Sequence, residues 1–292
     1  MEKPGQLDSL KIVVLAEDSV LYESPYLGQH GVSFLLQGTK RRDNKRILVD
    51  VGQNSPALLR NMEMMDISPS SIDAIVLTHC HYDHTHGIAA MLRSIDKRGV
   101  PVIAHQDIFR LNFLTEPRFR HVGIMPGDSR EEIEKAGGSM VLSRDPVTLM
   151  PGITTTGEVK RQTDFEEVGI GLKTIEDGVN RDDQMLDDIS VVANVRNKGL
   201  VIITGCSHAG IINILRQAME LTHCNRIEGI IGGLHLIDTP EDRIKRTVEE
   251  LRKLAPAWLY AGHCTGFKAQ VELYLALKQK FSPLHTGMQI EI

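Results

Sequence analysis

The stretch that decides the fold is residues 75–87, Ile-Val-Leu-Thr-His-Cys-His-Tyr-Asp-His-Thr-His-Gly. An apolar run ends at Thr78 and predicts a buried strand. Residues of metal-binding type follow directly: His79, His81, Asp83 and His84. In an extended segment residues 79 and 81 point to the same side, so both imidazoles leave the strand end toward one cavity. Neutral imidazoles with a carboxylate suit zinc, and also iron or manganese when further oxygen ligands join, so we predict a metal site here.

The composition is that of a chain with a sizeable core. Its 292 residues are 41% hydrophobic, with long apolar runs, and we expect a single domain over residues 1–292. The formal net charge is −5 with acids and bases mixed, so we expect no nucleic-acid partner, although a small phosphate-binding cleft is compatible with this charge. No segment approaches the roughly 18 apolar residues that span a bilayer, so we expect no membrane partner.

The N-terminus and the cysteines indicate a cytoplasmic protein. Residues 1–6, Met-Glu-Lys-Pro-Gly-Gln, lack the apolar segment of a secretory signal. Cys80, Cys206, Cys224 and Cys264 are scattered without Cys-x-x-Cys spacing, and all four adjoin or lie close to histidines. This pattern argues for reduced thiols rather than a disulfide framework.

The first half of the chain alternates strand and helix patterns. We expect strands over residues 11–15, 32–36, 47–51 and 100–104, and helices over residues 55–65 and 88–95. The turn-rich residues 22–31 could border a cleft. Asp50 ends the third strand, where a carboxylate either orients a metal-bound histidine or forms a turn, and we favour the first role. His86 is either an extra polar contact or exposed, and we expect His105 to be structural because nothing near it has ligand spacing.

Residues 107–150 change character and show no strong period. A loop-rich insertion of this kind often forms a lid over an active site. We expect its arginines, Arg110, Arg118 and Arg120, to meet an anionic substrate, with Arg118 as the candidate contact; a merely solvated face is the open alternative. The side chains expected to cover an apolar compartment are Phe109, Phe113, Phe119 and Met125.

The second half repeats an order of strand, polar turn and helix. We expect strands over residues 153–158, 189–195, 199–205, 227–233, 258–262 and 284–292, and helices over residues 211–221, 240–254 and 267–277. His208 and His263 follow strands at positions where α/β proteins place active-site residues, so we predict both as metal ligands, with helix capping as the alternative for His208. The acidic segment 182–188 is expected to be a hairpin connection. The spacing leaves open whether Glu158 approaches the site.

Four motifs together resemble a known family. They are residues 78–84, Thr-His-Cys-His-Tyr-Asp-His; residues 205–215, Gly-Cys-Ser-His-Ala-Gly-Ile-Ile-Asn-Ile-Leu; residues 232–236, Gly-Gly-Leu-His-Leu; and residues 262–269, Gly-His-Cys-Thr-Gly-Phe-Lys-Ala. The first resembles the signature of the metallo-β-lactamase superfamily. All four resemble its branch of metal-dependent hydrolases, β-lactamase superfamily II, which is related to dihydropterin–ribofuranosyl-aminobenzene phosphate synthase. The resemblance covers nearly the whole chain, from residue 32 to the terminal strand.

This resemblance implies an α/β fold, an αββα sandwich with a two-metal site at one edge between its sheets. The implied ligands are His79, His81 and His208 for one metal, and Asp83, His84 and His263 for the other. The superfamily usually has a bridging aspartate where Cys206 stands in this chain. Either the Cys206 thiolate binds metal in its place, or the site holds one ion tightly and another weakly. We therefore expect one or two divalent ions, zinc first, with manganese or iron as alternatives.

Such a site supports two classes of reaction. Two close divalent ions activate water, polarise an ester or phosphoryl oxygen and stabilise a leaving oxyanion, which suits hydrolysis of a phosphoester or an acyl bond. The resemblance also implies pterin transfer, in which an arylamine attacks a methylene carbon and diphosphate leaves. Asp83 is the catalytic candidate that orients a water or a metal. His235 is a candidate proton donor or substrate contact, and a structural role is equally compatible with its position at a strand end.

We therefore predict a metal-dependent enzyme, a hydrolase or a dihydropteroate-type transferase, that acts on a small phosphorylated substrate or a reduced pterin. A general metal-dependent phosphodiesterase or esterase is the first alternative. A non-catalytic pterin- or nucleotide-binding protein is the second, because the bridging acid is missing. Reduction of oxygen or nitric oxide at a di-iron site is less favoured, since such members carry a flavin-binding domain for which 292 residues leave no room.

Overall fold

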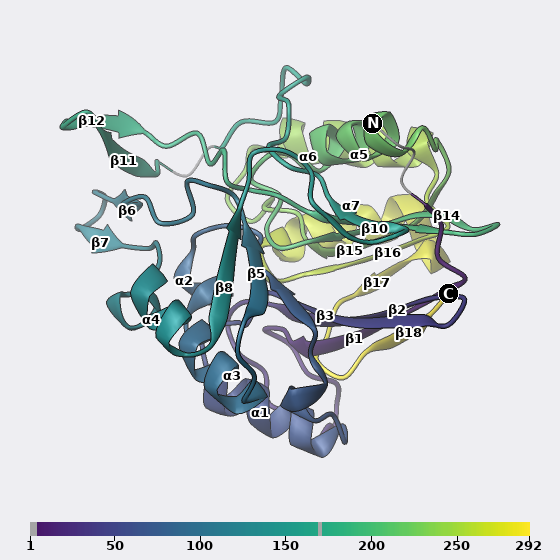
Figure 1. Cartoon of the computed structure of the whole chain (residues 1–292). Coiled ribbons are helices and arrows are strands. Elements are labelled where there is room, and N and C mark those ends of the chain that lie inside the picture. Colours follow the sequence, from purple (N-terminus) through teal and green to yellow (C-terminus); the bar gives the residue numbers. More distant parts are fainter. Residues whose placement is uncertain (1–4, 169–170) are drawn as a thin grey trace.

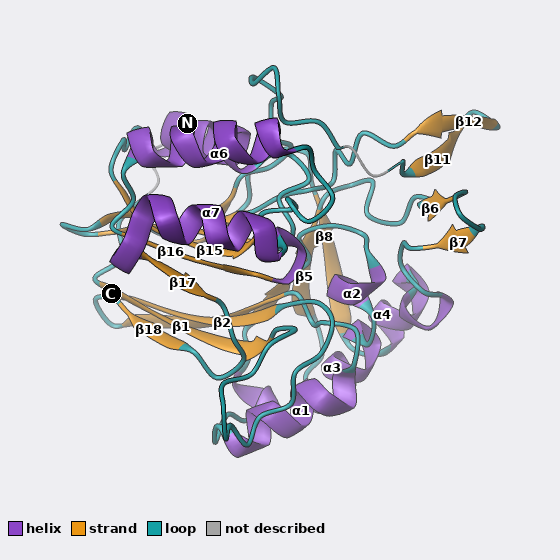
Figure 2. Ribbon diagram, turned by 180° about the vertical axis from the view of Figure 1, so that it is seen from behind, coloured by secondary structure: helices purple, strands orange, loops and turns teal. Residues whose placement is uncertain are grey.

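The structure of the chain, a computed structural model, describes residues 5–168 and 171–292. The prediction that the N-terminus lacks a secretory signal concerns a stretch whose first four residues lie outside these ranges. Within the described ranges the strands form two seven-stranded sheets and one four-stranded sheet. The two large sheets face each other, and helices cover the outer face of each (Figure 1 and Figure 2). The predicted αββα sandwich is confirmed.

The first large sheet contains the N-terminal strands and the strand that precedes the metal-binding stretch. In spatial order its strands are β18 (Gln289–Glu291), β1 (Ser9–Ala16), β2 (Ser33–Lys40), β3 (Asp43–Val49), β4 (Ala74–Val76), β5 (Val100–Ala104) and β8 (Gly138–Leu142). The interior strand β4 is wholly buried, as expected for an apolar strand covered on both faces. Strands β3, β4, β5 and β8 are parallel, so their C-terminal ends meet at one edge.

The second large sheet is built from the second half of the chain. In spatial order its strands are β17 (Phe281–Pro283), β16 (Trp258–Gly262), β15 (Ile227–Gly233), β14 (Gly199–Thr204), β13 (Val191–Val195), β10 (Ile153–Thr155) and β9 (Thr148–Met150). Strands β14, β15, β16 and β17 are parallel, so the turns that follow the first three of them lie side by side.

Helices connect the parallel strands and pack on the sheets through apolar stripes. They are α1 (Ser55–Met64), α2 (Tyr82–Thr85), α3 (Ile88–Ile95), α4 (Arg130–Lys135), α5 (Ile211–Thr222), α6 (Glu241–Leu254) and α7 (Phe267–Leu277), with short 3₁₀ turns η1 (Pro69–Ser71), η2 (Pro126–Asp128), η3 (His263–Thr265) and η4 (Lys278–Lys280). Leu92 of α3 belongs to the core outside the first sheet, and Leu215 of α5 to the core outside the second. A third core, which includes Val76 and Ile203, lies between the sheets. None of the helices in residues 5–168 and 171–292 is long and apolar enough to cross a membrane.

A small sheet stands out from the body of the molecule (Figure 1). Its strands, in order, are β12 (Val179–Asp182), β11 (Lys173–Glu176), β6 (Phe113–Leu114) and β7 (Arg120–His121). Residues 107–150, the interval predicted as a lid insertion, are divided among all three sheets. Strands β6 and β7 belong to the small sheet, whereas β8 is an edge strand of the first large sheet and β9 an edge strand of the second.

Predicted and observed elements agree best in the parallel parts of the sandwich. The structure has the predicted bounds for the helices at 88–95 and 267–277 and for the strands at 100–104, 227–233 and 258–262. The prediction for the acidic segment 182–188 is wrong. It does not close a hairpin but links β12 of the small sheet to β13 of the second large sheet.

Candidate metal centre

The six side chains predicted as metal ligands converge at one edge of the sandwich. The first four follow β4, in the adjoining turn and in α2, the fifth follows β14, and the sixth begins η3 after β16. They are His79, His81, Asp83, His84, His208 and His263. All six are buried. Segments more than 170 residues apart in the chain therefore meet because parallel strands of each sheet end at the same edge.

His79, His81 and His208 form the first cluster, the histidine group. The ring centroids of His79 and His81 are 4.7 Å apart, and the ring of His208 lies 4.9 Å from the first and 4.8 Å from the second. A ring nitrogen of His79 and one of His208 lie within 4.8 Å of each other and of Sγ of Cys206, a spacing that a metal ion can close. The ring of His81 stands beside them.

Asp83, His84 and His263 form the second cluster, the aspartate group. Oδ2 of Asp83 lies 3.2 Å from Nε2 of His263 and 3.5 Å from Nε2 of His84. The two imidazole rings are 5.3 Å apart. The ring of His84 is also 4.2 Å from that of His79, so the two groups adjoin.

In the histidine group, hydrogen bonds to neighbouring residues determine which ring nitrogen of His79 and of His81 is free to bind a metal ion. Oγ1 of Thr78 donates to Oδ2 of Asp50 at 2.7 Å and therefore accepts from Nδ1 of His79 at 3.0 Å. Nε2 of His79 keeps a bare lone pair and has no hydrogen-bond partner among the described residues. Nε2 of His81 lies 3.2 Å from Oδ1 of Asn112, an acceptor, so His81 presents Nδ1. Bare nitrogens at a buried site fit a metal ion.

The aspartate group is arranged in the same way. Nδ1 of His84 lies 2.7 Å from Oδ2 of Asp50, and Nδ1 of His263 lies 3.1 Å from Oδ2 of Asp18. Both imidazoles consequently present Nε2 to Asp83. A carboxylate on the far nitrogen orients an imidazole and makes it a stronger metal ligand. Asp50 stands where the sequence predicted it, against a histidine of the site.

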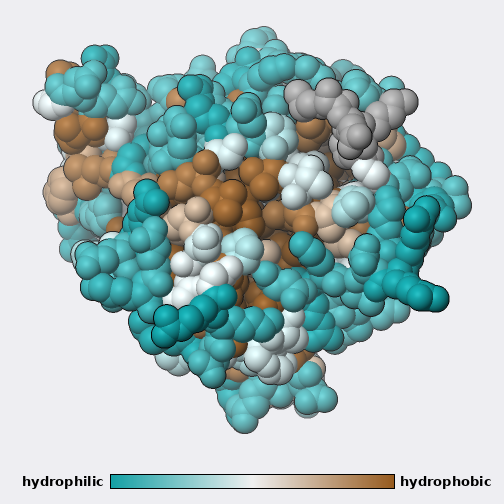
Figure 3. Space-filling model, viewed as in Figure 1, coloured by the Kyte–Doolittle hydropathy of each residue, from teal (hydrophilic) through white to brown (hydrophobic). Residues whose placement is uncertain are grey.

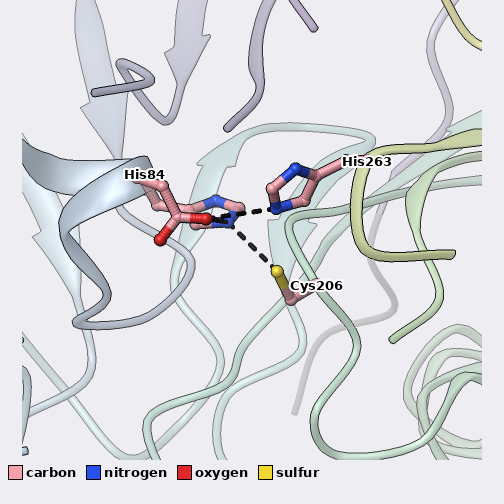
Figure 4. Close-up of side chains that lie close together, drawn as sticks. His84, Cys206 and His263 are labelled. Atoms are coloured by element: carbon pink, nitrogen blue, oxygen red, sulfur yellow. Dashed lines mark hydrogen bonds and ion pairs between the residues drawn. The ribbon is translucent and has the colours of Figure 1, made fainter. Parts of the chain in front are cut away.

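Cys206 lies between the two groups. Its Sγ is 3.1 Å from Nε2 of His84 (Figure 4) and within 4.8 Å of donor atoms in both groups. The side chain is buried, and burial raises the pKa of the thiol well above its usual value, with Cys264 acting in the same direction. A thiol thus occupies the place between the groups where the resemblance leads one to expect a bridging carboxylate.

The comparisons with known proteins agree with this geometry. The sequence pattern of the metallo-beta-lactamase superfamily matches residues 28–169, which include the metal-binding stretch. The chain is 42% identical to the 7,8-dihydropterin-6-methyl-4-(beta-D-ribofuranosyl)-aminobenzene-5'-phosphate synthase of Methanocaldococcus jannaschii, over 98% of each chain. This chain belongs to the metallo-β-lactamase superfamily. Within that superfamily it belongs to the branch that contains this synthase.

Two further matches agree with membership of the superfamily. An uncharacterised protein of Methanocaldococcus jannaschii is 33% identical over 90% of this chain and 93% of its own length. The crystal structure of a metal-dependent hydrolase of the beta-lactamase superfamily superposes with a TM-score of 0.81 at 24% identity, over 97% of this chain and 99% of the other. The predicted family and fold are confirmed, and the prediction of an enzyme is supported. The metallo-β-lactamase fold implies divalent metal binding. Two sets of side chains at this edge are close enough to hold an ion: Asp83, His84, Cys206 and His263, and His79, Cys206 and His208.

The pKa values of the imidazoles differ between the histidine group and the aspartate group. In the histidine group burial lowers the pKa of His79 and of His208 well below the usual value, and repulsion from neighbouring imidazoles acts in the same direction. Burial also lowers the pKa of His81, to about 4, although Asp83 opposes it. The three imidazoles are therefore neutral at pH 7, the form in which nitrogen binds a metal ion.

In the aspartate group burial alone would lower the imidazole pKa values, but nearby charges reverse its effect. Asp83 and Asp50 raise the pKa of His84. Cys264 and the carboxylates at its two ring nitrogens raise the pKa of His263 well above the usual value. A cation is thus favoured in this group, and a metal ion that binds here must displace protons.

Two residues beside the aspartate group, Asp18 and His30, were not predicted from the sequence. Nδ1 of His30 lies 3.2 Å from Oδ1 of Asp18, and its Nε2 lies 3.5 Å from Oδ2 of Asp83. Asp18 also binds His263, as described above. Two signals for them were present in the sequence: an acidic pair directly after the first strand, and a turn-rich segment, residues 22–31, that was expected to border a cleft.

A buried ion-pair network was also missed, and it corrects the role expected of Arg110. Nε of Arg110 lies 2.7 Å from Oδ2 of Asp183, and its Nη1 lies 2.8 Å from Oδ2 of Asp187. Asp183 also accepts from Nδ2 of Asn112 at 2.7 Å, and Asp187 accepts from the backbone nitrogen of Cys80 at 2.8 Å. Arg110 is therefore engaged inside the protein. Since buried carboxylates require such partners, the acidic segment folds against the site instead of turning in solvent.

The two predicted substrate contacts lie in different surroundings. The ring of His235 is 4.1 Å from that of His208, and neither of its nitrogens has a hydrogen-bond partner in the described part of the chain. Arg118 is exposed in the turn between β6 and β7, apart from the side chains that converge. The structure therefore brings His235 to the candidate ligands, whereas Arg118 lies at the surface of the small sheet.

The remaining sequence candidates have local partners. Nε2 of the buried His105 lies 3.2 Å from Oε2 of Glu158, which also pairs with Nε of Arg144 at 2.9 Å. His105 has the structural setting expected of it, and Glu158 is engaged there. His86 is exposed, with Nδ1 2.9 Å from Oδ2 of Asp128.

Proposed function

We propose that this chain is a metal-dependent transferase that joins a reduced pterin to an arylamine, with diphosphate as the leaving group. The observation that carries the proposal is the convergence of five buried histidines and Asp83 at one edge of the sandwich. It occurs in a chain that is 42% identical over 98% of its length to a synthase, and the name of that synthase describes a dihydropterin linked through a methyl group to a ribofuranosyl-aminobenzene phosphate. The substrate is accordingly a small phosphorylated or pterin-like molecule.

The proposed metal ligands are the two groups described above. The histidine group would hold one divalent ion through Nε2 of His79, Nδ1 of His81 and a nitrogen of His208. The aspartate group would hold the other through Asp83 and Nε2 of both of its histidines. Nitrogen-rich donor sets favour zinc, and the carboxylate leaves manganese or iron as alternatives. The four free cysteines support a cytoplasmic setting.

The protein's own residues would orient the reactants and move the proton. When bound, two divalent ions supply positive charge that stabilises a departing diphosphate. In the transfer, the arylamine nitrogen forms a bond to the pterin methylene carbon, the bond from that carbon to the diphosphate oxygen breaks, and the amine releases a proton. Asp83 orients the ion of its group, and a ring nitrogen of His235 contacts the substrate and carries that proton.

The pterin ring requires a flat apolar compartment as well as the metal site. The small sheet supplies candidates: the ring centroid of Phe113 is 5.2 Å from that of Phe119, which is 68% exposed. On the face of the molecule seen in Figure 3, apolar residues gather across the middle and continue toward the side where the small sheet lies. We propose that the part of the lid around β6 and β7 covers the ring and that the exposed Arg118 and Arg120 contact phosphate groups.

The experiment compares two activities of the metal-loaded protein: binding of a dihydropterin and cleavage of a generic chromogenic phosphodiester. Phe113→Ala and Arg118→Ala should weaken pterin binding by about tenfold, equivalent to about 1.4 kcal/mol, with little change in any diester cleavage. Arg98→Ala is the matched control, because Arg98 is an exposed arginine next to the opposite, N-terminal end of β5.

The outcome separates transfer from hydrolysis. A transferase should also form the pterin–arylamine product from a dihydropterin diphosphate and an aminobenzene derivative, with diphosphate released in equal amount. If the intact protein binds no pterin but cleaves the diester efficiently, a phosphodiesterase or esterase replaces the proposal. If metal binds and neither substrate turns over, the protein is a binding protein.

A further inference from the structure

Three residues occupy equivalent positions at neighbouring strand ends. Cys206, His235 and Cys264 each lie two residues beyond the end of a strand, namely β14, β15 and β16. These strands are neighbours and parallel, so their C-terminal ends meet at one edge of the sheet. The shared offset brings two thiols and an imidazole to one place, although 58 residues separate the two cysteines in the chain.

The backbone beyond the strands is paired in a way that fixes this arrangement. Gly233 donates its N–H to the carbonyl oxygen of Gly205 at 2.9 Å, and Leu236 donates to the carbonyl oxygen of Cys264 at 3.1 Å. A Cβ on Gly233 would lie 2.5 Å from Sγ of Cys264, so the glycine leaves the room that this thiol occupies.

The three possible ligand atoms are close together and buried. Sγ of Cys206, Sγ of Cys264 and a ring nitrogen of His235 all lie within 4.8 Å of one another, and the residues are 2%, 8% and 9% exposed. In a tetrahedral zinc site, bonds of about 2.3 Å to sulfur and 2.0–2.1 Å to nitrogen set the ligand atoms roughly 3.6–3.8 Å apart. Shifts of about 1 Å at most close such a site. His235 offers a nitrogen for it because neither of its nitrogens has a partner within residues 5–168 and 171–292.

We propose that Cys206, His235 and Cys264 form a further metal site, which takes a thiophilic divalent cation such as zinc or its analogue cadmium. On binding, both thiols release their protons to solvent, two metal–sulfur bonds form, and a neutral imidazole nitrogen completes the set. The charges of two thiolates and one divalent cation cancel, so the buried site carries no net charge. One nitrogen of His235 binds the ion. The other then bears the proton of the neutral ring, so it can donate a hydrogen bond to the substrate but takes up the proton of the amine only when this ion is absent.

This thiolate site would share a ligand with the two-metal site. Sγ of Cys206 is also 3.1 Å from Nε2 of His84, and the ring of His235 is 4.1 Å from that of His208. A thiolate has several lone pairs and can bind two ions at once. The site therefore gives a physical reason for a cysteine where a bridging aspartate is expected: sulfur, but not a carboxylate, suits a thiophilic ion held jointly with Cys264.

The test is a cadmium titration of the metal-free protein with its thiols reduced, followed by sulfur-to-cadmium charge-transfer absorbance and by bound cadmium per chain. Cys264→Ser should lose about half of the charge-transfer intensity and bind the thiolate-site ion at least about 100-fold more weakly, beyond the roughly 10–100-fold effect of an outer partner. His235→Gln should keep most of the intensity but weaken the same ion. Cys224→Ser is the matched control, because Cys224 lies outside the cluster.

Unchanged intensity and stoichiometry in both Cys264→Ser and His235→Gln would overturn the site, since Cys206 would then bind only as part of the two-metal site. Circular dichroism of the metal-free variants establishes that they are folded. A second measurement, made on the native chain, tests the site even if the Cys264→Ser variant fails to fold. In the native chain bound cadmium should protect both Cys206 and Cys264 from alkylation, as measured by peptide mass spectrometry. Protection of Cys206 alone would also overturn the proposal.

Discussion

Nδ1 of His84 lies 2.7 Å from Oδ2 of Asp50, and both side chains are fully buried. The carboxylate is itself fixed, because it accepts from the backbone nitrogen of Thr78 at 2.8 Å and from its Oγ1 at 2.7 Å. Asp50, directly after β3, has a left-handed φ of 56°, which turns the chain as it leaves the sheet. One residue at a strand end therefore sets the direction of a donor atom in α2.

Asp50→Asn should weaken metal binding by about 10–100-fold, because an amide provides one acceptor oxygen where the carboxylate provides two. Competition with a chelator of known affinity measures the change. Asp66→Asn is the matched control, since Asp66 is exposed and has the same φ of 56°. Equal metal affinity in Asp50→Asn and the native chain would show that this contact does not orient a ligand.

Asn112 should act on His81 through a hydrogen bond. Asp183 accepts from Nδ2 of Asn112, which leaves Oδ1 to accept from Nε2 of His81 and leaves Nδ1 of that ring free to bind a metal ion. Asn112→Leu leaves a buried N–H and a buried carboxylate oxygen without this partner, and should lower the free energy of unfolding by about 1–3 kcal/mol.

Metal affinity of the Asn112→Leu protein should also fall by about 10–100-fold. Denaturant unfolding of the metal-free protein and chelator competition measure the two effects separately. Asn180→Leu is the control, an exposed asparagine in β12 of the small sheet. Native metal affinity in Asn112→Leu, whatever its stability, would mean that the tautomer of His81 does not depend on Asn112.

The sequence predicts those parts of the site that depend on local pattern. The convergence of the histidines could be predicted because parallel strands place their C-terminal ends together. His79 and His81 follow an apolar strand, and further histidines lie just beyond two later strands. Asp50 was found for the same reason. In each case the strand pattern and the polar residue are adjacent in the chain.

The network around Arg110 could not be predicted in that way. Its partner Asp183 lies 73 residues away, in a segment whose acidic run is also typical of a turn. These carboxylates are buried only in the folded chain, where their negative charge requires a partner such as Arg110. Asp18 is a similar case: its partner His263 is 245 residues further along the chain. Long-range pairing of charges leaves no periodic pattern in either segment.

The two metal-binding groups should lose their ions at different pH. In the aspartate group the pKa values of His84 and His263 are raised, so protons compete with a metal ion already as the pH falls through neutrality. In the histidine group the pKa values are lowered, to about 4 for His81, so that ion should remain bound to lower pH. Metal content after dialysis at pH values from about 8 to 5, a range around the ordinary histidine pKa of about 6.5, measures the loss.

The His263→Gln variant separates the two groups in this measurement. It should hold only the ion that persists at low pH, because the aspartate group has lost a donor. Simultaneous loss of both ions over one pH interval in the native chain would contradict the assignment of raised and lowered pKa values to separate ions.

Gly205, directly after β14, should be intolerant of even one added methyl group. A Cβ there would collide with Oγ1 of Thr78 and lie 2.9 Å from Oδ2 of Asp50 and 3.1 Å from Nδ1 of His84. These atoms belong to the hydrogen bonds that fix His79 and His84, so Gly205→Ala should destabilise the fold by about 1–3 kcal/mol and weaken the binding of both ions. Gly127→Ala is the matched control, because no atom lies within 4 Å of a Cβ there. Thermal unfolding and metal content of the two variants make the comparison, and native metal content in a folded Gly205→Ala protein would show that the Thr78–Asp50–His84 contacts are not needed to hold the ions.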